Sequence, residues 1–285
     1  MSQRAALVAT PGGETAGTVG AVVAEVIQEI AAGKARCEHL VQVYREPIEL
    51  AQSVATFFAA GFEVGEPAVA VLTAANRPLI LERLEARGWR PAELEAEGVL
   101  HLRDAEETLA AIDAGPGTGA RSFNRVVGEL LDRAAATDAN RRIRVFGEMV
   151  DVLVRRGDRA AADTLEGYWN DLFAKRHFTL LCGYKVDLFD VATYIELLPQ
   201  VYRSHTHVLQ TADDRRFEEA VDRALTDVLG AEDVQKVYAR VARSGDKAPR
   251  SHLALQWICA HMPRAASDVF AAAQAFFAEA DAAAA

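Results

Sequence analysis

The sequence predicts an α/β protein with a doubly wound, mostly parallel five-stranded sheet, followed by a helical C-terminal extension. Between residues 36 and 190, short apolar runs alternate with longer amphipathic segments, as expected where parallel strands are joined by crossover helices. The run 68–72 reads Ala-Val-Ala-Val-Leu without polar alternation, which is typical of a strand buried on both faces. After Phe189 only helical patterns follow.

Five strands are expected because the apolar runs are too short for helices. They are residues 39–44, 68–72, 99–102, 143–146 and 178–182. The segments between them repeat apolar residues at helical spacing. The helices expected there are residues 47–60, 77–87, 104–113, 121–136 and 158–175.

Three regions are expected along the chain. Residues 1–35 form a tail with a leader helix over 15–32, where valine and isoleucine recur at helical spacing. Residues 36–200 form the α/β domain, and residues 201–285 form the helical extension. Helices are expected near residues 190–199, 213–229, 232–243, 250–262 and 264–280. Their apolar stripes, with Phe217 as an example, should pack on the α/β domain or on a second copy of the chain.

Charge, hydropathy and cysteine content limit the partners and the location to be expected for this protein. The net charge of −10 argues against nucleic acid, since such binding requires clustered lysine and arginine. No stretch approaches the roughly 20 apolar residues of a membrane span, and the N-terminus lacks the apolar core of a secretion signal. The three cysteines are widely spaced and odd in number, which is typical of reduced thiols. A cytoplasmic protein is therefore expected.

Several fragments, in order over residues 36–200, resemble the DcmR-type sensory (methanogen/methylotroph DcmR sensory, MEDS) domain family. The most specific are Gly-Glu-Met at 147–149 and Leu-Cys-x-Tyr-x-x-x-x-Phe at 181–189; the others lie at 39–44, 57–66 and 167–170. The family is similar in fold to RecA/KaiC-type domains. The resemblance implies a degenerate RecA-like sheet and a sensory role in bacterial or archaeal signalling.

The position of a RecA-type phosphate loop argues against nucleotide hydrolysis. After the first strand the chain reads Arg45, Glu46, Pro47, with no glycine and with a carboxylate that would repel phosphate. A glycine cluster at residues 115–119 approaches a phosphate loop, but a helical segment precedes it instead of a strand. We expect a loop that caps the next helix, and anion binding there stays open.

No catalytic or metal-binding motif is evident. Cys37 with His39, His205 with His207, and His177 with Cys182 are short-range pairs, but none belongs to a four-ligand spacing. Cys182 lies in an apolar strand, where an inert buried thiol is expected. We therefore expect no metal, no cofactor and no enzymatic activity.

A ligand-binding rim is expected where the strands end, because open α/β sheets bind ligands beyond the carboxyl ends of their strands. The side chains at or just past these ends are Tyr44, Thr73, Arg103, Glu148 and Tyr184. Glu148 follows a strand and a glycine, which permits an unusual turn. The alternative is that Glu148 pairs with Arg144 or Arg103 and only stabilises the rim.

Three functions remain open at this stage. The first is a sensory domain that binds a small molecule at the rim and relays the signal to a partner protein. The second is a protein–protein interaction module with a vestigial pocket, and the third is a nucleotide-using enzyme. A homodimer is also left open. Fold alone does not choose between these functions.

Overall fold

The computed structural model describes residues 38–114, 119–136, 141–243 and 248–284. Its centre is one parallel sheet of six strands in the order β3-β2-β4-β5-β1-β6. The strands are β1 (His39–Tyr44), β2 (Ala68–Leu72), β3 (Leu100–Asp104), β4 (Ile143–Gly147), β5 (Phe178–Lys185) and β6 (His207–Val208). The predicted α/β class and its five strands are confirmed. The leader helix over 15–32 and residues 115–118 of the glycine cluster lie outside the described residues.

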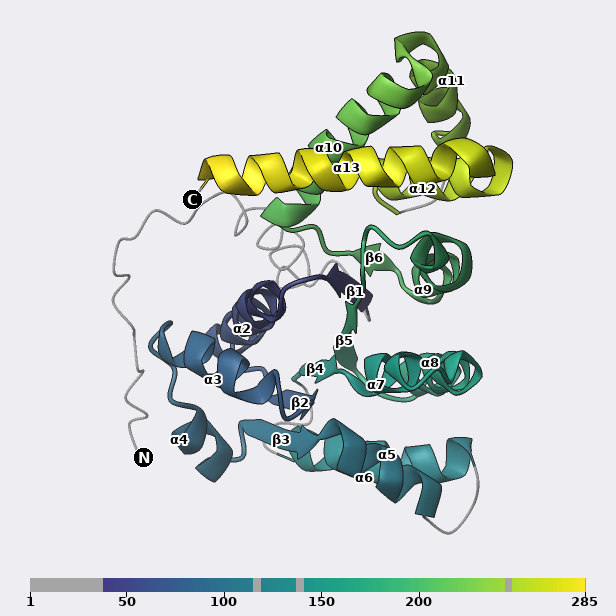
Figure 1. Cartoon of the computed structure of the whole chain (residues 1–285). Helices are drawn as coiled ribbons and strands as arrows, with labels where there is room; N and C mark the ends of the chain where they lie inside the picture. The colour runs from purple at the N-terminus through teal and green to yellow at the C-terminus, as the bar shows by residue number, and fades with distance from the viewer. Residues whose placement is uncertain (1–37, 115–118, 137–140, 244–247, 285) are drawn as a thin grey trace.

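Helices cover both faces of the sheet (Figure 1). The helices of the first face are α2 (Pro47–Glu63), α3 (Arg77–Glu85) and α4 (Pro91–Ala96). The elements of the second face are α5 (Ala105–Ala114), α6 (Ala120–Ala135), α7 (Met149–Arg155), α8 (Arg159–Phe173), the π-helix η1 (Thr193–Leu197) and α9 (Leu198–Ser204). Since β2 and β4 are neighbours whose following helices lie on opposite faces, the sheet has a topological switch point between them.

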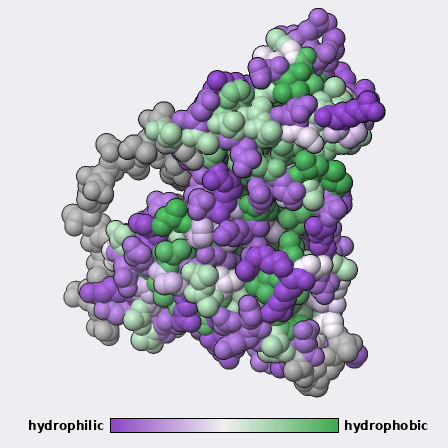
Figure 2. All heavy atoms as spheres, in the orientation of Figure 1, coloured by the Kyte–Doolittle hydropathy of each residue, from purple (hydrophilic) through white to green (hydrophobic). Residues whose placement is uncertain are grey.

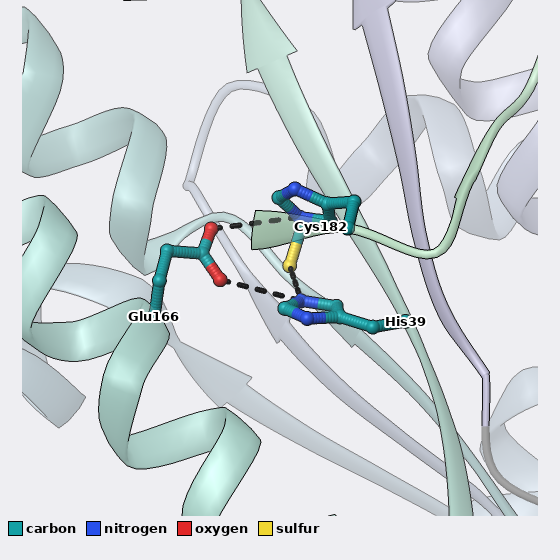
Figure 3. A group of neighbouring side chains, drawn as sticks. His39, Glu166 and Cys182 are labelled. Carbon is teal, nitrogen blue, oxygen red and sulfur yellow. Dashed lines mark hydrogen bonds and ion pairs between the residues drawn. The ribbon is translucent and has the colours of Figure 1, made fainter. Parts of the chain in front are cut away.

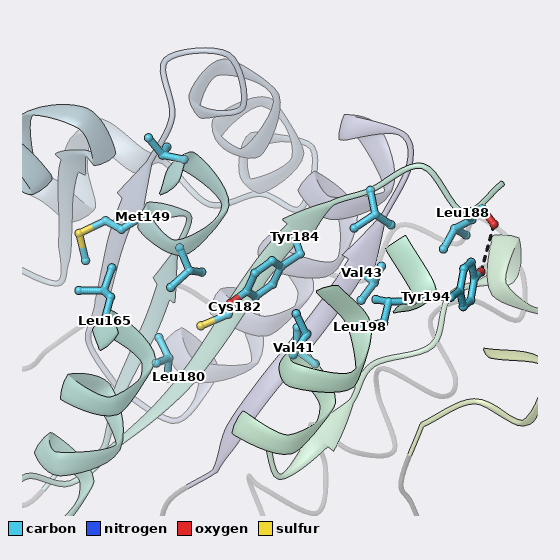
Figure 4. Packing of buried hydrophobic residues seen from close by; sticks show 14 of the residues in the cluster. Val41, Val43, Met149, Leu165, Leu180, Cys182, Tyr184, Leu188, Tyr194 and Leu198 are labelled. Carbon is cyan, nitrogen blue, oxygen red and sulfur yellow. Dashed lines mark hydrogen bonds between the residues drawn. The ribbon is translucent and has the colours of Figure 1, made fainter. Parts of the chain in front are cut away.

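The two faces have separate hydrophobic cores, because successive strand residues point to opposite sides. Leu40 and Leu181 point toward α2, whereas Val41, Cys182 and Tyr184 point toward α8 and α9. Figure 4 shows this second face, with residues of β1 and β5 lying against Leu165 and Leu198. The strands are nearly continuous apolar runs because both faces are covered.

Three details differ from the sequence-based expectation. β5 continues to Lys185, three residues beyond its predicted end, because its pairing with β1 runs on to Tyr44. A sixth strand, β6, was not expected after Phe189; its two residues pair with β1 and carry no strand signal of their own. The short helices α4 and α7 were also missed, since six or seven residues are too few to establish a helical period.

The C-terminal region consists of α10 (Ala212–Leu229), α11 (Ala231–Val241), α12 (Arg250–His261) and α13 (Pro263–Ala284). These helices share a hydrophobic core with η1 and α9. Phe217 is buried and its ring centroid lies 5.5 Å from that of Phe189. The predicted packing of the extension on the α/β domain is therefore confirmed.

The surface seen in Figure 2 is largely hydrophilic, with hydrophobic patches over the C-terminal helices. Within the part of the chain that the structure describes, no helix combines the length and apolar character needed to cross a membrane.

Candidate functional site

The first polar cluster lies at the switch point between β2 and β4. Glu148 is fully buried at the end of β4, and its carboxylate accepts hydrogen bonds from the Thr73 backbone N–H at 2.7 Å and from Asn76 Nδ2 at 2.5 Å. Asn76 Nδ2 also donates to the Tyr44 hydroxyl at 3.0 Å. Burial raises the pKa of Glu148, although the hydrogen bonds from Thr73 and Asn76 oppose the rise. We call Tyr44, Thr73, Asn76 and Glu148 the rim cluster.

Of the five predicted rim residues, the structure therefore brings Tyr44, Thr73 and Glu148 together. Arg103 lies within the edge strand β3, is exposed, and donates to the carbonyl of its neighbour Leu102. Tyr184 lies within β5, opposite Val43, and points to the face away from Tyr44. It is separate from the rim cluster because the side chain of Tyr44 lies on the opposite face of the sheet.

Two further expectations about Glu148 are corrected. Its partners are not the predicted arginines: Arg144 Nε instead donates to Glu66 Oε2 at 2.6 Å on the α2 side of the sheet. Gly147 supplies no unusual turn, because it is the last residue of β4 and its φ is not positive. The donors to Glu148 are instead Thr73 and Asn76, in the loop after β2. Sequence spacing does not reveal that this loop meets Glu148.

The turn between β1 and α2, where a RecA-type fold has its phosphate loop, does not have the features of such a loop. Pro47 begins α2 directly after β1, and Glu46 occupies the N-cap position without a side-chain cap hydrogen bond. A proline at the first helical position provides no backbone N–H. This turn therefore lacks the glycine-rich row of amides that holds phosphate.

A second polar cluster, missed at the sequence level, lies beneath α8 and α9 on the other face of the sheet. His39 projects from β1, Cys182 from β5 and Glu166 from α8 (Figure 3). The fourth member, His205, directly follows α9. All four are buried, and their metal-ligating atoms lie within 4.8 Å of one another. We call these four residues the buried centre.

Short contacts connect the buried centre. His39 Nε2 lies 3.4 Å from Cys182 Sγ and 3.3 Å from Glu166 Oε2. His205 Nε2 lies 3.5 Å from Glu166 Oε1. The Tyr184 hydroxyl donates to Glu166 Oε1 at 2.5 Å. Tyr184, predicted for the rim, thus belongs to the surroundings of the buried centre.

Each histidine ring is oriented by its other nitrogen. His205 Nδ1 lies 2.6 Å from the Val201 carbonyl oxygen, and His39 Nδ1 lies 3.1 Å from Asn170 Oδ1. Because the Val201 carbonyl is an acceptor, Nδ1 carries the proton in His205. In a neutral ring, the Nε2 lone pair then points into the buried centre.

Burial controls the charges here. It lowers the pKa of His205 to about 4, although Glu166 opposes this shift, so the ring is neutral at pH 7. Burial and the nearby Glu166 carboxylate raise the pKa of the Cys182 thiol. For Glu166, burial favours protonation, but His205, His39 and the Tyr184 hydroxyl outweigh it and lower its pKa. The buried centre therefore combines an ionised carboxylate with a neutral imidazole and a neutral thiol.

A small cavity adjoins this carboxylate. Its volume is about 20 Å³, which is room for about one water molecule. Glu166 and Tyr184 line its inner side, and Arg159, Gln200 and Ser204 are among its other residues. Glu166 is the member of the buried centre that lines this cavity.

The buried centre was missed because its members come from four separate segments of the chain. Residue spacing detects ligands only within one segment, and the pairs considered there, such as His39 with Cys37, differ from those that meet. One signal was present: His39 and Cys182 interrupt otherwise apolar strands with groups that bind metals.

The chain matches a known family of domains. The family model described as the MEthanogen/methylotroph, DcmR Sensory domain (MEDS) matches residues 38–206. No curated protein matches the chain. The matched segment contains both the rim cluster and the buried centre, and it ends directly before β6.

Proposed function

Because the chain belongs to the MEDS family of sensory domains, we propose that it senses a small ligand at the buried centre and relays its presence to a partner protein. The observation that carries the proposal is the convergence of four buried, chemically reactive side chains from four segments. Buried polar groups of this kind cost stability unless they are paired, so a cluster of them suggests a binding role. The proposal includes no nucleotide hydrolysis, because the phosphate-loop position holds Glu46 and Pro47.

The route of the signal follows from the position of His205. The next residue, Thr206, donates from its backbone N–H to the His39 carbonyl at 2.7 Å, and its hydroxyl accepts from the His39 N–H at 3.0 Å. β6 then pairs with β1, and Thr211 caps α10 together with Asp214. A shift of His205 toward a ligand would therefore move the strand that leads into the C-terminal helices.

A second link runs through α9. Its Val201 carbonyl accepts from His205, and its Tyr202 hydroxyl hydrogen-bonds to His252 Nδ1 of α12. His252 also contacts the rings of Tyr194 and Phe217. Since α9 contacts both the buried centre and α12, we propose that helices α10–α13 change their dynamics when a ligand binds and thereby address the partner.

The first experiment identifies the ligand and tests the relay. Native mass spectrometry of the full chain, purified from its host, reports any bound molecule. That molecule is then added to stripped protein, and hydrogen exchange is measured along the chain. We expect slower exchange in β1, β5 and α9, and also in α10. Binding that leaves exchange in α10–α13 unchanged would contradict the relay.

The second experiment separates the two clusters with matched variants. Glu166→Gln and Glu148→Gln each neutralise one buried carboxylate while keeping its shape. We expect the ligand to stabilise the Glu148→Gln variant as it stabilises the parent, by about 2.7 kcal/mol at 100 times its Kd, and to stabilise Glu166→Gln less. The opposite result would assign sensing to the rim cluster, where the carboxyl-end rule for α/β sheets favours a ligand.

A further inference from the structure

We propose that the buried centre binds a divalent transition-metal ion of the zinc class. This inference rests on the proposed function, because it names the chemistry that the sensing site would bind. The ligands would be the Nε2 atoms of His39 and His205, the Cys182 thiolate and the Glu166 carboxylate.

The spacing of these atoms fits a tetrahedral ion. With metal–nitrogen and metal–oxygen bonds of about 2.0–2.1 Å and a metal–sulfur bond of about 2.3 Å, neighbouring ligand atoms lie about 3.3–3.6 Å apart. The three contacts within the buried centre are 3.3, 3.4 and 3.5 Å. The remaining pairs of ligand atoms lie within 4.8 Å of one another, so the side chains would close by up to about 1 Å around a bound ion.

The hydrogen-bonding groups of the buried centre fit a bound cation better than they fit direct contacts with one another. His205 donates from Nδ1 to the Val201 carbonyl, so its Nε2 lone pair faces Glu166 Oε1 at 3.5 Å and acceptor faces acceptor. Glu166 Oε2 and His205 Nε2 are buried without a hydrogen-bond partner among the described residues. A buried acceptor without a donor is costly. A metal ion bound by His205 Nε2 and the Glu166 carboxylate removes the conflict because it accepts lone pairs from both groups.

The surroundings resemble the outer shell of a metal site. Metal-binding histidines commonly donate their other ring N–H to a carbonyl, which fixes the ring. His205 donates to the Val201 carbonyl in this way, and His39 Nδ1 lies 3.1 Å from Asn170 Oδ1. The Tyr184 hydroxyl holds the Glu166 carboxylate in the same way. All three groups are already in place.

The donor set restricts the choice of metal. Mg²⁺ and Ca²⁺ prefer oxygen ligands alone, whereas two imidazoles with a thiolate and a carboxylate suit zinc and its neighbours. On binding, the metal displaces the thiol proton of Cys182 to solvent. No electron transfer is involved.

Cobalt and zinc binding to the full chain test the inference. Metal-free protein is prepared with a chelator and titrated with Co²⁺ and then with Zn²⁺. We expect one ion per chain, a thiolate-to-cobalt charge-transfer band, visible bands of tetrahedral cobalt, and loss of these bands when Zn²⁺ replaces Co²⁺. A titration without these bands would overturn the proposal.

Matched variants locate the site. Cys182→Ser should abolish the charge-transfer band, whereas Cys259→Ser should keep it, because Cys259 is a buried thiol of α12 outside the buried centre. Asn170→Ala, which leaves all four ligands intact, should weaken Zn²⁺ affinity about 10- to 100-fold. A band that persists in Cys182→Ser, or an unchanged affinity in Asn170→Ala, would count against this site even if one of the other variants failed to fold.

Metal binding and the relay to helices α10–α13 can fail independently of each other. If Zn²⁺ binds but hydrogen exchange in α10–α13 is unchanged, the metal site stands and the relay fails. If Zn²⁺ does not bind while another molecule from the host slows exchange in α10, the sensory function stands and the metal assignment fails.

Discussion

The docking of the C-terminal helices on the α/β domain should depend on pH through His252. This ring is fully enclosed between Tyr194, Tyr202 and Phe217, and burial lowers its pKa to about 3. In the unfolded chain its pKa is about 6.5. Because the folded pKa is depressed, the contribution of the neutral ring to stability is present above pH 6.5 and is lost as the pH falls toward 3.

The size of the effect follows from these two values. At pH 4.5 nearly every unfolded chain has protonated this histidine, whereas the folded state has not. The free energy of unfolding should therefore fall by about 2.5 kcal/mol between pH 7 and pH 4.5 through this one group. His252→Phe keeps an aromatic ring but removes the titrating group. The free energy of unfolding of this variant should therefore fall by about 2.5 kcal/mol less than that of the parent between pH 7 and pH 4.5.

Urea denaturation of parent and variant at pH 7 and pH 4.5 measures this difference. The variant leaves the Tyr202 hydroxyl without its partner, which costs about 1–3 kcal/mol, but that cost is the same at both pH values. Hydrogen exchange in α12 reports the same change locally. His261→Phe is the control, because His261 is an exposed histidine of the same helix. Equal pH dependence in the parent and in His252→Phe would refute the reasoning.

Three further predictions concern the fold and the rim cluster. Phe217→Asp should lower the free energy of unfolding by more than about 3 kcal/mol, because it places an unpaired charge in the core shared with the C-terminal helices; an unchanged melting temperature would contradict this packing. Glu66→Gln should cost about 3–5 kcal/mol, since it leaves the fully buried Arg144 without its anion. Arg144→Met removes the buried charge, so in urea denaturation it should lower the free energy of unfolding less than Glu66→Gln does. A larger loss for Arg144→Met than for Glu66→Gln would refute this account. Glu148→Gln should cost about 1–3 kcal/mol, because one carboxylate oxygen becomes an NH2 donor that opposes either the Thr73 N–H or Asn76 Nδ2. Thermal melting that matches the parent would show that the charge is not needed there.

Much of the fold could be predicted because it depends on local patterns. The apolar runs of β1–β5 and the helical spacing between them are properties of neighbouring residues, and the layered α/β architecture follows from them. The start of α10 also depends on neighbouring residues, because Asp214 completes a capping box with Thr211 there.

The rim cluster could be predicted only in part. Glu148 and Thr73 meet as the carboxyl-end rule suggests, but Tyr184 does not join them. The face to which the Tyr184 side chain points depends on whether β5 ends at Cys182 or continues to Lys185. The pairing of β5 with β1 determines where β5 ends. Since side chains alternate along a strand, the length and register of the strand determine which residues share a face.

By itself, the sequence determined the class of the fold, five of the six strands of the sheet and most of its helices, because burial and periodicity show in consecutive residues. Only the tertiary structure decided that His39, Glu166, Cys182 and His205 meet. They are brought together by the parallel pairing of β1 with β5 and by the packing of α8 and α9 over both strands. Such contacts depend on strand order and helix placement across more than a hundred residues, which the spacing of ligands within one segment does not encode.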